Sequence, residues 1–121
     1  LLLGWQFPER NSEIMVSPEA ALNMSRILRE AVTNVLRHAR ASSIRVDTRL
    51  DDDHFALDIE DDGIGLPPQL APHRGMSSMQ ARAAALGATL EWQPQEPGCR
   101  VTLRVPLEQL AGQVVRHEPA L

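Results

Sequence analysis

The feature of this chain that most limits its fold is a change in the period of its apolar residues near position 41. Upstream, apolar residues recur every three or four positions, as along one face of a helix: Ala21, Met24, Leu28, Ala31, Val35 and Ala39. Downstream, Ile44, Val46, Thr48 and Leu50 alternate with Arg45, Asp47 and Arg49, which predicts a half-buried strand. A chain with both patterns must combine helices with a sheet.

The long helix has a well-marked start. Ser17 is suited to the N-cap and Pro18 to the first helical position. The apolar face that follows ends near Arg40, so we predict one helix from Ser17 to about Arg40.

The other segments complete an α+β pattern. We predict a short strand over 1–7, a second alternating strand over 55–59 after an acidic turn at 51–53, a helix over 75–86, and a final hairpin of 90–92 with 101–105. This order predicts a two-layer α/β sandwich, with helices on one face of a mixed, mostly antiparallel sheet. Residues 1–106 are expected to form the domain and residues 107–121 a C-terminal tail without a core pattern.

Composition excludes several classes of protein. The chain has 121 residues, enough for one domain, and its net charge of −4 provides no basic field for nucleic acid. Its single cysteine, Cys99, cannot form an internal disulfide. No apolar run approaches the roughly 20 residues of a membrane span. Residues 1–5 lack the basic region of a signal peptide, and we expect the chain to continue a longer protein, whose membrane attachment stays open.

A first group of polar residues lies on the predicted long helix. Glu30, Asn34 and His38 are spaced by four, which places them on one side, and Arg37 borders that side. An Asn side-chain oxygen is a suitable ligand for Mg²⁺, which also binds substrate phosphates. This set suits a metal–triphosphate, although an ordinary solvated helix face would have the same spacing.

A second group follows the strand over 55–59. Asp61 is followed by Gly63 and Gly65, and glycines allow a ligand to approach the backbone closely. A carboxylate here can accept a hydrogen bond from the exocyclic amine of adenine, whereas guanine has a carbonyl oxygen in that position. An Asp-Gly turn without a ligand is the structural alternative.

A third group surrounds the start of the second helix. Gly75 exposes backbone N–H groups at the positive end of the helix dipole, and Arg74 could add a charge-assisted bond to phosphate. Core packing accounts for the side chains of Met76 and Met79. The sequence has no phosphate loop with lysine, no paired cysteines and no zinc-binding pair of helical histidines.

In this order the three groups resemble the N, G1 and G2 boxes of the GHKL ATPase superfamily. The segment from Glu30 through Asn34 to Ala39 is similar to the N box, and Asp61-x-Gly63-x-Gly65 to the G1 box. The segment from Gly75 to Gly87 resembles the G2 box of nitrate-sensor-like histidine kinases, and Gly98 to Pro106 their last strand. The resemblance spans about residues 5 to 106.

The resemblance implies a Bergerat fold that binds ATP and Mg²⁺ under a short lid between about Gly65 and Gly75. Asn34 would ligate Mg²⁺, Glu30 would orient the phosphate end as the second catalytic residue, and Asp61 would hold the adenine amine. The other residues assigned to nucleotide binding are Arg37, His38, Gly63, Gly65, Arg74, Gly75 and Met76. Cys99 stands where the family often has a threonine, which weakens the water-mediated support of adenine expected there.

The function implied is that of the catalytic domain of a sensor histidine kinase. It would supply the γ-phosphoryl of ATP to a histidine on an upstream dimerisation domain, for relay to a response regulator. The parent would be a cytoplasmic or membrane-anchored homodimer, with this domain in the cytoplasm. None of His38, His54, His73 and His117 is expected to be the acceptor, so this chain should not autophosphorylate alone. An anti-sigma-factor serine kinase and a non-catalytic nucleotide-binding interaction module are the alternatives.

Overall fold

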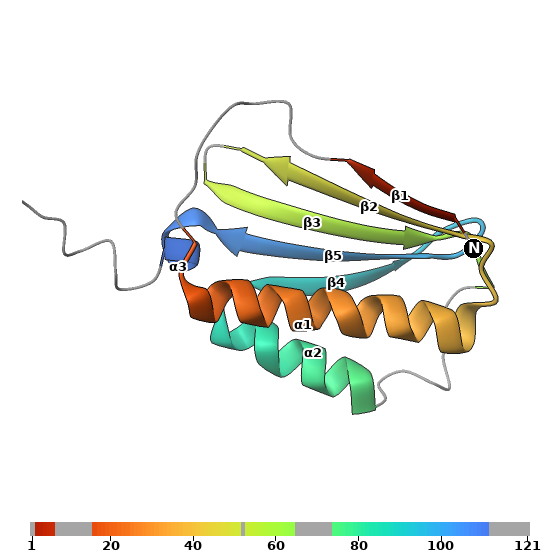
Figure 1. Ribbon diagram of the computed structural model, residues 1–121, viewed down its shortest axis with the longest axis horizontal. Coiled ribbons are helices and arrows are strands. Elements are labelled where there is room, and N and C mark those ends of the chain that lie inside the picture. The colour runs from red at the N-terminus through yellow and green to blue at the C-terminus, as the bar shows by residue number, and fades with distance from the viewer. Residues whose placement is uncertain (1, 7–15, 52, 65–73, 112–121) are drawn as a thin grey trace, which may run out of the picture.

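The chain forms one five-stranded sheet covered on one face by two helices (Figure 1). The computed structural model describes residues 2–6, 16–51, 53–64 and 74–111. The strand order is β1-β2-β3-β5-β4, and only the β1–β2 pair is parallel among the described strands. The strands are β1 Leu2–Gln6, β2 Ser43–Leu50, β3 His54–Asp61, β4 Thr89–Pro94 and β5 Cys99–Pro106. The predicted α+β sandwich with a mostly antiparallel sheet is confirmed.

Helix α1 (Pro18–Asn34) begins where the sequence predicts. The Ser17 side chain accepts a hydrogen bond from the Ala20 N–H at 3.1 Å, which satisfies one of the free amides of the first turn. The helix continues into a π-helical turn, η1 (Val35–Ala39), and Arg40 then reverses the chain with a φ of 50°. The predicted end near Arg40 is therefore confirmed, but the last turn is wider than an α-turn. No helix in the described part of the chain has the length and hydropathy of a membrane span.

Helix α2 (Arg74–Ala85) lies beside α1 and packs with it on the same face of the sheet (Figure 1). Strand β5 alternates as predicted: Val101, Leu103 and Val105 point into the core. The side chains that are almost completely buried come from both layers: Ile27, Ile44, Val46, Ile59, Met79, Leu103, Val105 and Leu110. The core therefore lies between the sheet and the two long helices.

The other face of the sheet is polar and held by ion pairs. Asp58 is buried there, and it accepts hydrogen bonds from the Arg49 Nε at 2.9 Å and the Thr102 hydroxyl at 2.7 Å. Arg100 pairs with Glu60 on the neighbouring strands at 2.7 Å. A buried carboxylate with such partners avoids the cost of an unsatisfied charge.

The end of the domain differs from the prediction. A short helix, α3 (Leu107–Ala111), follows β5, and Leu110 is completely buried. The Leu110 carbonyl accepts a hydrogen bond from the Ser17 N–H at 2.8 Å, which joins α3 to the start of α1. The expectation of no core residue beyond Pro106 is wrong at Leu110, because a one-turn helix is too short to show a period. Residues 112–121 of the expected tail lie outside the described residues.

Candidate functional site

The segments that carry the candidate residues meet at one end of the molecule. Helix α1 ends there, β3 ends there with Asp61, and α2 begins there with Arg74; α3 lies at the opposite end (Figure 1). The turn between β4 and β5 lies at the same end as Asp61, because Cys99 is the register partner of Asp61. The fold therefore brings together three groups that are far apart in the sequence.

Asn34 is the last residue of α1 and half-buried against α2. Its Nδ2 lies 3.8 Å from the sulfur of Met79, a weak hydrogen bond to a fully buried side chain. With the amide nitrogen directed at α2, the side-chain oxygen is the end that remains for a ligand. Carbonyl oxygens are ligands for Mg²⁺, and Glu30, half-buried one α-helical turn earlier, could add a carboxylate.

Arg37 and His38 lie in the π-helical turn that follows Asn34. The sequence predicted His38 on the same side of the helix as Asn34, four residues away, with Arg37 bordering that side. In η1 the hydrogen bonds follow a five-residue spacing in place of the four-residue spacing of an α-helix. The Arg37 side chain is exposed, and the side chain of His38 lies outside the described residues. The alignment of Glu30, Asn34 and His38 on one side, and the assignment of Arg37 and His38 to phosphate, therefore stay predictions.

Asp61 is buried at the end of β3, with 9% of its surface exposed. Its Oδ1 accepts a hydrogen bond from the Gly63 N–H at 2.9 Å, which fixes the orientation of the carboxylate. Burial raises the pKa of this carboxyl, the Gly63 hydrogen bond partly offsets the effect, and the charge of Asp62 adds to it. A buried, oriented carboxylate where the ends of several helices and strands lie together is typical of a binding site.

Gly63 contributes its backbone N–H to this site. The sequence argument rested on close approach of a ligand to the backbone, which stays a prediction. The described glycines with positive φ are Gly87 and Gly98. Gly65 lies outside the described residues. Arg74, Gly75 and Met76 form the first turn of α2, as predicted for the helix start, and nothing is described of their side chains.

Asp62 has a structural role that the sequence argument missed. It accepts hydrogen bonds from the Ser42 N–H at 2.8 Å, the Ser42 hydroxyl at 2.7 Å and the Ser43 N–H at 2.9 Å. The Ser42 and Ser43 bonds lower the pKa of Asp62 to about 2. Asp62 therefore ties the start of β2 to the end of β3, directly beside Asp61.

Cys99 and Gly98 lie on the other side of Asp61. The Cys99 thiol is buried, and burial together with the nearby Asp61 charge raises its pKa. The Sγ lies 3.7 Å from the Arg100 carbonyl, and a backbone hydrogen bond with Gln93 partly offsets the rise in pKa. Cys99, at the position that the resemblance gives to the family's threonine, is the register partner of Asp61. A thiol there is a weaker hydrogen-bond donor than a hydroxyl.

Residues 19–109 match the sequence profile of the family described as histidine kinase-, DNA gyrase B-, and HSP90-like ATPase. The chain belongs to this family.

Curated proteins similar to the chain include a histidine-protein kinase/phosphatase and a nitrate/nitrite sensor protein. The chain is 34% identical over 100 residues to the signal transduction histidine-protein kinase/phosphatase UhpB of Salmonella typhimurium, covering 80% of this chain and 19% of UhpB. It is 36% identical over 95 residues to the nitrate/nitrite sensor protein NarQ of Escherichia coli, covering 74% of this chain and 17% of NarQ. The chain therefore spans less than a fifth of the length of these relatives.

Solved structures of histidine kinase domains share the fold. The histidine kinase domain of the blue-light activated kinase EL346 from Erythrobacter litoralis superposes with a TM-score of 0.75 at 21% identity, over 90% of this chain and 57% of that one. The ATP binding domain of PrrB from Mycobacterium tuberculosis gives 0.67 at 21% identity, over 86% of this chain and 79% of that one. At this identity the likeness establishes the fold of the ATPase family and nothing finer.

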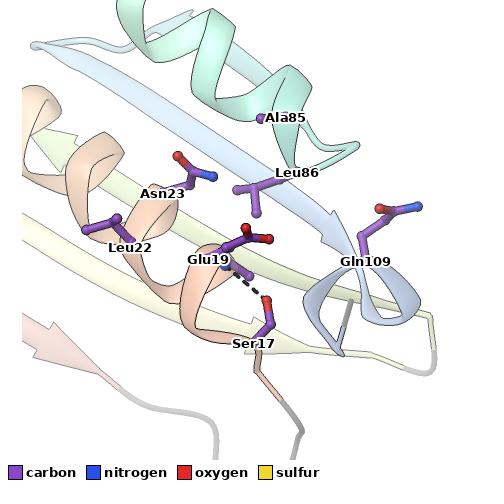
Figure 2. A pocket seen from close by; sticks show the side chains of 8 residues that line it. Ser17, Glu19, Leu22, Asn23, Ala85, Leu86 and Gln109 are labelled. Carbon is purple, nitrogen blue, oxygen red and sulfur yellow. Dashed lines mark hydrogen bonds between the residues drawn. The ribbon is translucent and has the colours of Figure 1, made fainter. Parts of the chain in front are cut away.

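A groove of about 460 Å³ lies at the opposite end of this ATPase-family domain from Asp61. Figure 2 shows it between the start of α1, the end of α2 and α3. It contains no member of the three sequence groups, and its lining residues are Ser17, Glu19, Ala20, Leu22, Asn23, Ala85, Leu86 and Gln109.

Proposed function

We propose that the chain is the Mg·ATP-binding catalytic domain of a sensor histidine kinase. The observation that carries the proposal is the buried Asp61 carboxylate, oriented by Gly63 at the end of the domain where Asn34 and the start of α2 also lie. Membership of the ATPase family supports ATP as the nucleotide. The named relatives favour a histidine kinase over a serine kinase with the same fold.

In this proposal Asp61 selects the base. Its carboxylate accepts a hydrogen bond from the exocyclic amine of adenine, while the carbonyl oxygen of guanine would face it unfavourably. Because the Asp61 site is buried, a polar group left there without a partner costs its own desolvation, about 1–3 kcal/mol. Gly63 and Gly65 shape the pocket for the base and the start of the lid.

The phosphates lie toward the end of α1 and the start of α2. Asn34 gives its side-chain oxygen to Mg²⁺, with its nitrogen held at Met79, and Glu30 orients the phosphate end. Backbone N–H groups of the first turn of α2 suit a phosphate through the helix dipole. The further residues proposed for the phosphate end are Arg37, His38, Arg74, Gly75 and Met76.

The reaction is transfer of the γ-phosphoryl group to a histidine on an upstream dimerisation domain of the parent protein. Phosphoryl transfer depends chiefly on positioning and on neutralisation of charge by Mg²⁺ and cationic groups, which is what this site would supply. The parent would act as a homodimer with a response regulator as its partner, and this domain would lie in the cytoplasm whether or not the parent is anchored in the membrane.

Calorimetric titration of the chain with ATP, ADP and GTP, each with and without Mg²⁺, tests the proposal. We expect ATP to bind more tightly than GTP, Asp61→Asn to reduce this preference, and Asn34→Ala to remove the effect of Mg²⁺. Gln109→Ala, at the opposite end of the domain, is the control and should bind as the wild type does. Failure of the folded wild-type chain to bind ATP would refute the proposal.

A further inference from the structure

Gly98 occupies a position that no larger residue could take without moving Asp61. It lies in the turn from β4 to β5, directly before Cys99, the register partner of Asp61. Its φ is +97°, a conformation that residues with a side chain rarely adopt. Gly98 is also buried, so its Cα faces protein atoms.

The atoms it faces belong to Asp61. A Cβ at Gly98 would lie 1.8 Å from the Asp61 carbonyl oxygen, 2.7 Å from its carbonyl carbon and 3.1 Å from Oδ1 of its carboxylate. The first two atoms are backbone, and β3 is paired with a strand on each side, so they cannot move aside as a flexible side chain would. A side chain at position 98 must therefore displace the Asp61 peptide or separate β5 from β3 at this end.

Gly63 holds the same carboxylate. Its N–H donates to Asp61 Oδ1 at 2.9 Å, the atom that a Gly98 Cβ would also approach. Because Gly63 is hydrogen-bonded to Asp61 itself, displacement of the Asp61 peptide would disturb this hydrogen bond as well.

We propose that Gly98 is a positioning residue for recognition of the adenine base, acting through Asp61. The inference rests on the proposed function, since it assigns to Gly98 the placement of the group that reads the base. Gly98 itself need not touch the nucleotide. Its part is to let the β4–β5 turn approach the Asp61 backbone closely enough to hold the carboxylate where Gly63 orients it.

The chain offers a matched control in Gly87. Gly87 also has a positive φ, +64°, so Gly87→Ala likewise places a side chain at a left-handed backbone position, although with less strain than at the φ of +97° of Gly98. The three atoms nearest to its Cβ would all belong to the side chain of Gln109, at 3.0–3.2 Å, at the α3 end of the molecule. A side chain can rotate away, and Asp61 is not involved.

The test compares Gly98→Ala with Gly87→Ala in two measurements. In calorimetry, Gly98→Ala should weaken ATP binding at least about tenfold and lower the preference for ATP over GTP, whereas Gly87→Ala should stay within about twofold of the wild type. In NMR, the Gly63 amide should report the titration of Asp61, and its shift and midpoint should change in Gly98→Ala but not in Gly87→Ala. The lowered pKa of Asp62 keeps its own titration separate.

The outcomes separate this inference from the proposed function. Wild-type ATP binding with unchanged affinity, selectivity and Gly63 titration in Gly98→Ala would refute the role of Gly98 and leave the proposed function standing. Absence of ATP binding in the wild type would refute the function, and the Gly63 titration would still test the contact. Should Gly98→Ala not fold, the wild-type chain decides: adenosine must shift the amides of Gly63 and Gly98, and inorganic triphosphate must not.

Discussion

Asp61 and Asp62 are adjacent carboxylates whose surroundings move their pKa values in opposite directions. Asp61 is buried with one hydrogen bond from Gly63, and burial raises its pKa. Asp62 is exposed, and the bonds from Ser42 and Ser43 lower its pKa to about 2. Ionisation of Asp61 therefore lowers the stability of the folded domain, whereas ionisation of Asp62 raises it. Such a cost is typical of a binding residue rather than a structural one.

Asp61→Asn should not lower the stability of the ligand-free domain at pH 7. The folded-state pKa of Asp61 is raised, so its favourable contribution exists below its unfolded pKa and is lost as pH rises through the folded value. An amide keeps the acceptor for Gly63 and removes the charge beside Asp62. Urea unfolding at pH 7 measures the stability, and the same variant should lose about ten- to hundredfold in ATP affinity, as expected for a hydrogen bond to a charged group. Clear destabilisation by Asp61→Asn would contradict this view of the site.

Asp62→Asn should destabilise the domain in a pH-dependent manner. Because the folded-state pKa of Asp62 is lowered, its contribution is present above its unfolded pKa of about 4 and disappears as pH falls toward about 2. The difference in unfolding free energy between wild type and variant should therefore shrink between pH 4 and pH 2. Denaturant titrations across this range measure this difference. A difference that stays constant down to pH 2 would argue against a stabilising role for the hydrogen bonds from Ser42 and Ser43 to Asp62.

Helix α1 spans the domain from the α3 end to the candidate site, so its two ends have separate roles. The capped start at Ser17 contributes stability, and the end at Asn34 carries a proposed ligand. The widened turn after Asn34 redirects the chain before β2. Extra-residue turns of this kind often occur at functional positions in helices.

Ser17→Ala should destabilise the domain by about 1 kcal/mol, since it removes the acceptor for the Ala20 N–H. ATP affinity should not change, because the cap lies at the opposite end of α1 from Asn34. Thermal unfolding with and without nucleotide measures both quantities. Ser25→Ala, at an exposed position within the same helix, serves as the control and should be neutral or slightly stabilising.

The sequence predicted the regular elements well because their signals are local. The helix start at Ser17 and the alternation along β5 depend on neighbours a few residues away. The hydrogen bonds of Asp62 join it to Ser43, 19 positions away, and to Ser42, 20 positions away. The contact between Gly98 and Asp61 likewise joins two strands. The widened turn after Asn34 has no periodic signature either. The residue types of the candidate site were therefore predictable, whereas the contacts that hold Asp61 in place were not.

Considered as one body, the domain has the candidate site at one end and the short helix α3 at the other. At the α3 end, Leu110 is buried in the core and its carbonyl accepts a hydrogen bond from the Ser17 N–H. These contacts hold α3 against the start of α1, far from Asp61. The groove beside α3 belongs to this end (Figure 2). Substitutions there should change stability without changing recognition of the base.

Leu110→Ala should destabilise the domain by about 2–5 kcal/mol, the range for a fully buried leucine. The folded fraction should still bind ATP with wild-type affinity. Chemical unfolding monitored by circular dichroism gives the first quantity and calorimetry the second. Gln109→Ala, next to it on the exposed side, should cost less than about 0.5 kcal/mol; an equal loss in both variants would show that Leu110 does not anchor α3.

The buried thiol of Cys99 makes this chain convenient for site-selective chemistry. It is the only cysteine in the sequence, and burial with a raised pKa keeps the reactive thiolate scarce. A cysteine introduced at the exposed Gln109 could therefore carry a fluorophore or spin label without removal of the native thiol. The rate at which Cys99 is modified would then measure how often the strands open next to Asp61, and a bound nucleotide should lower that rate.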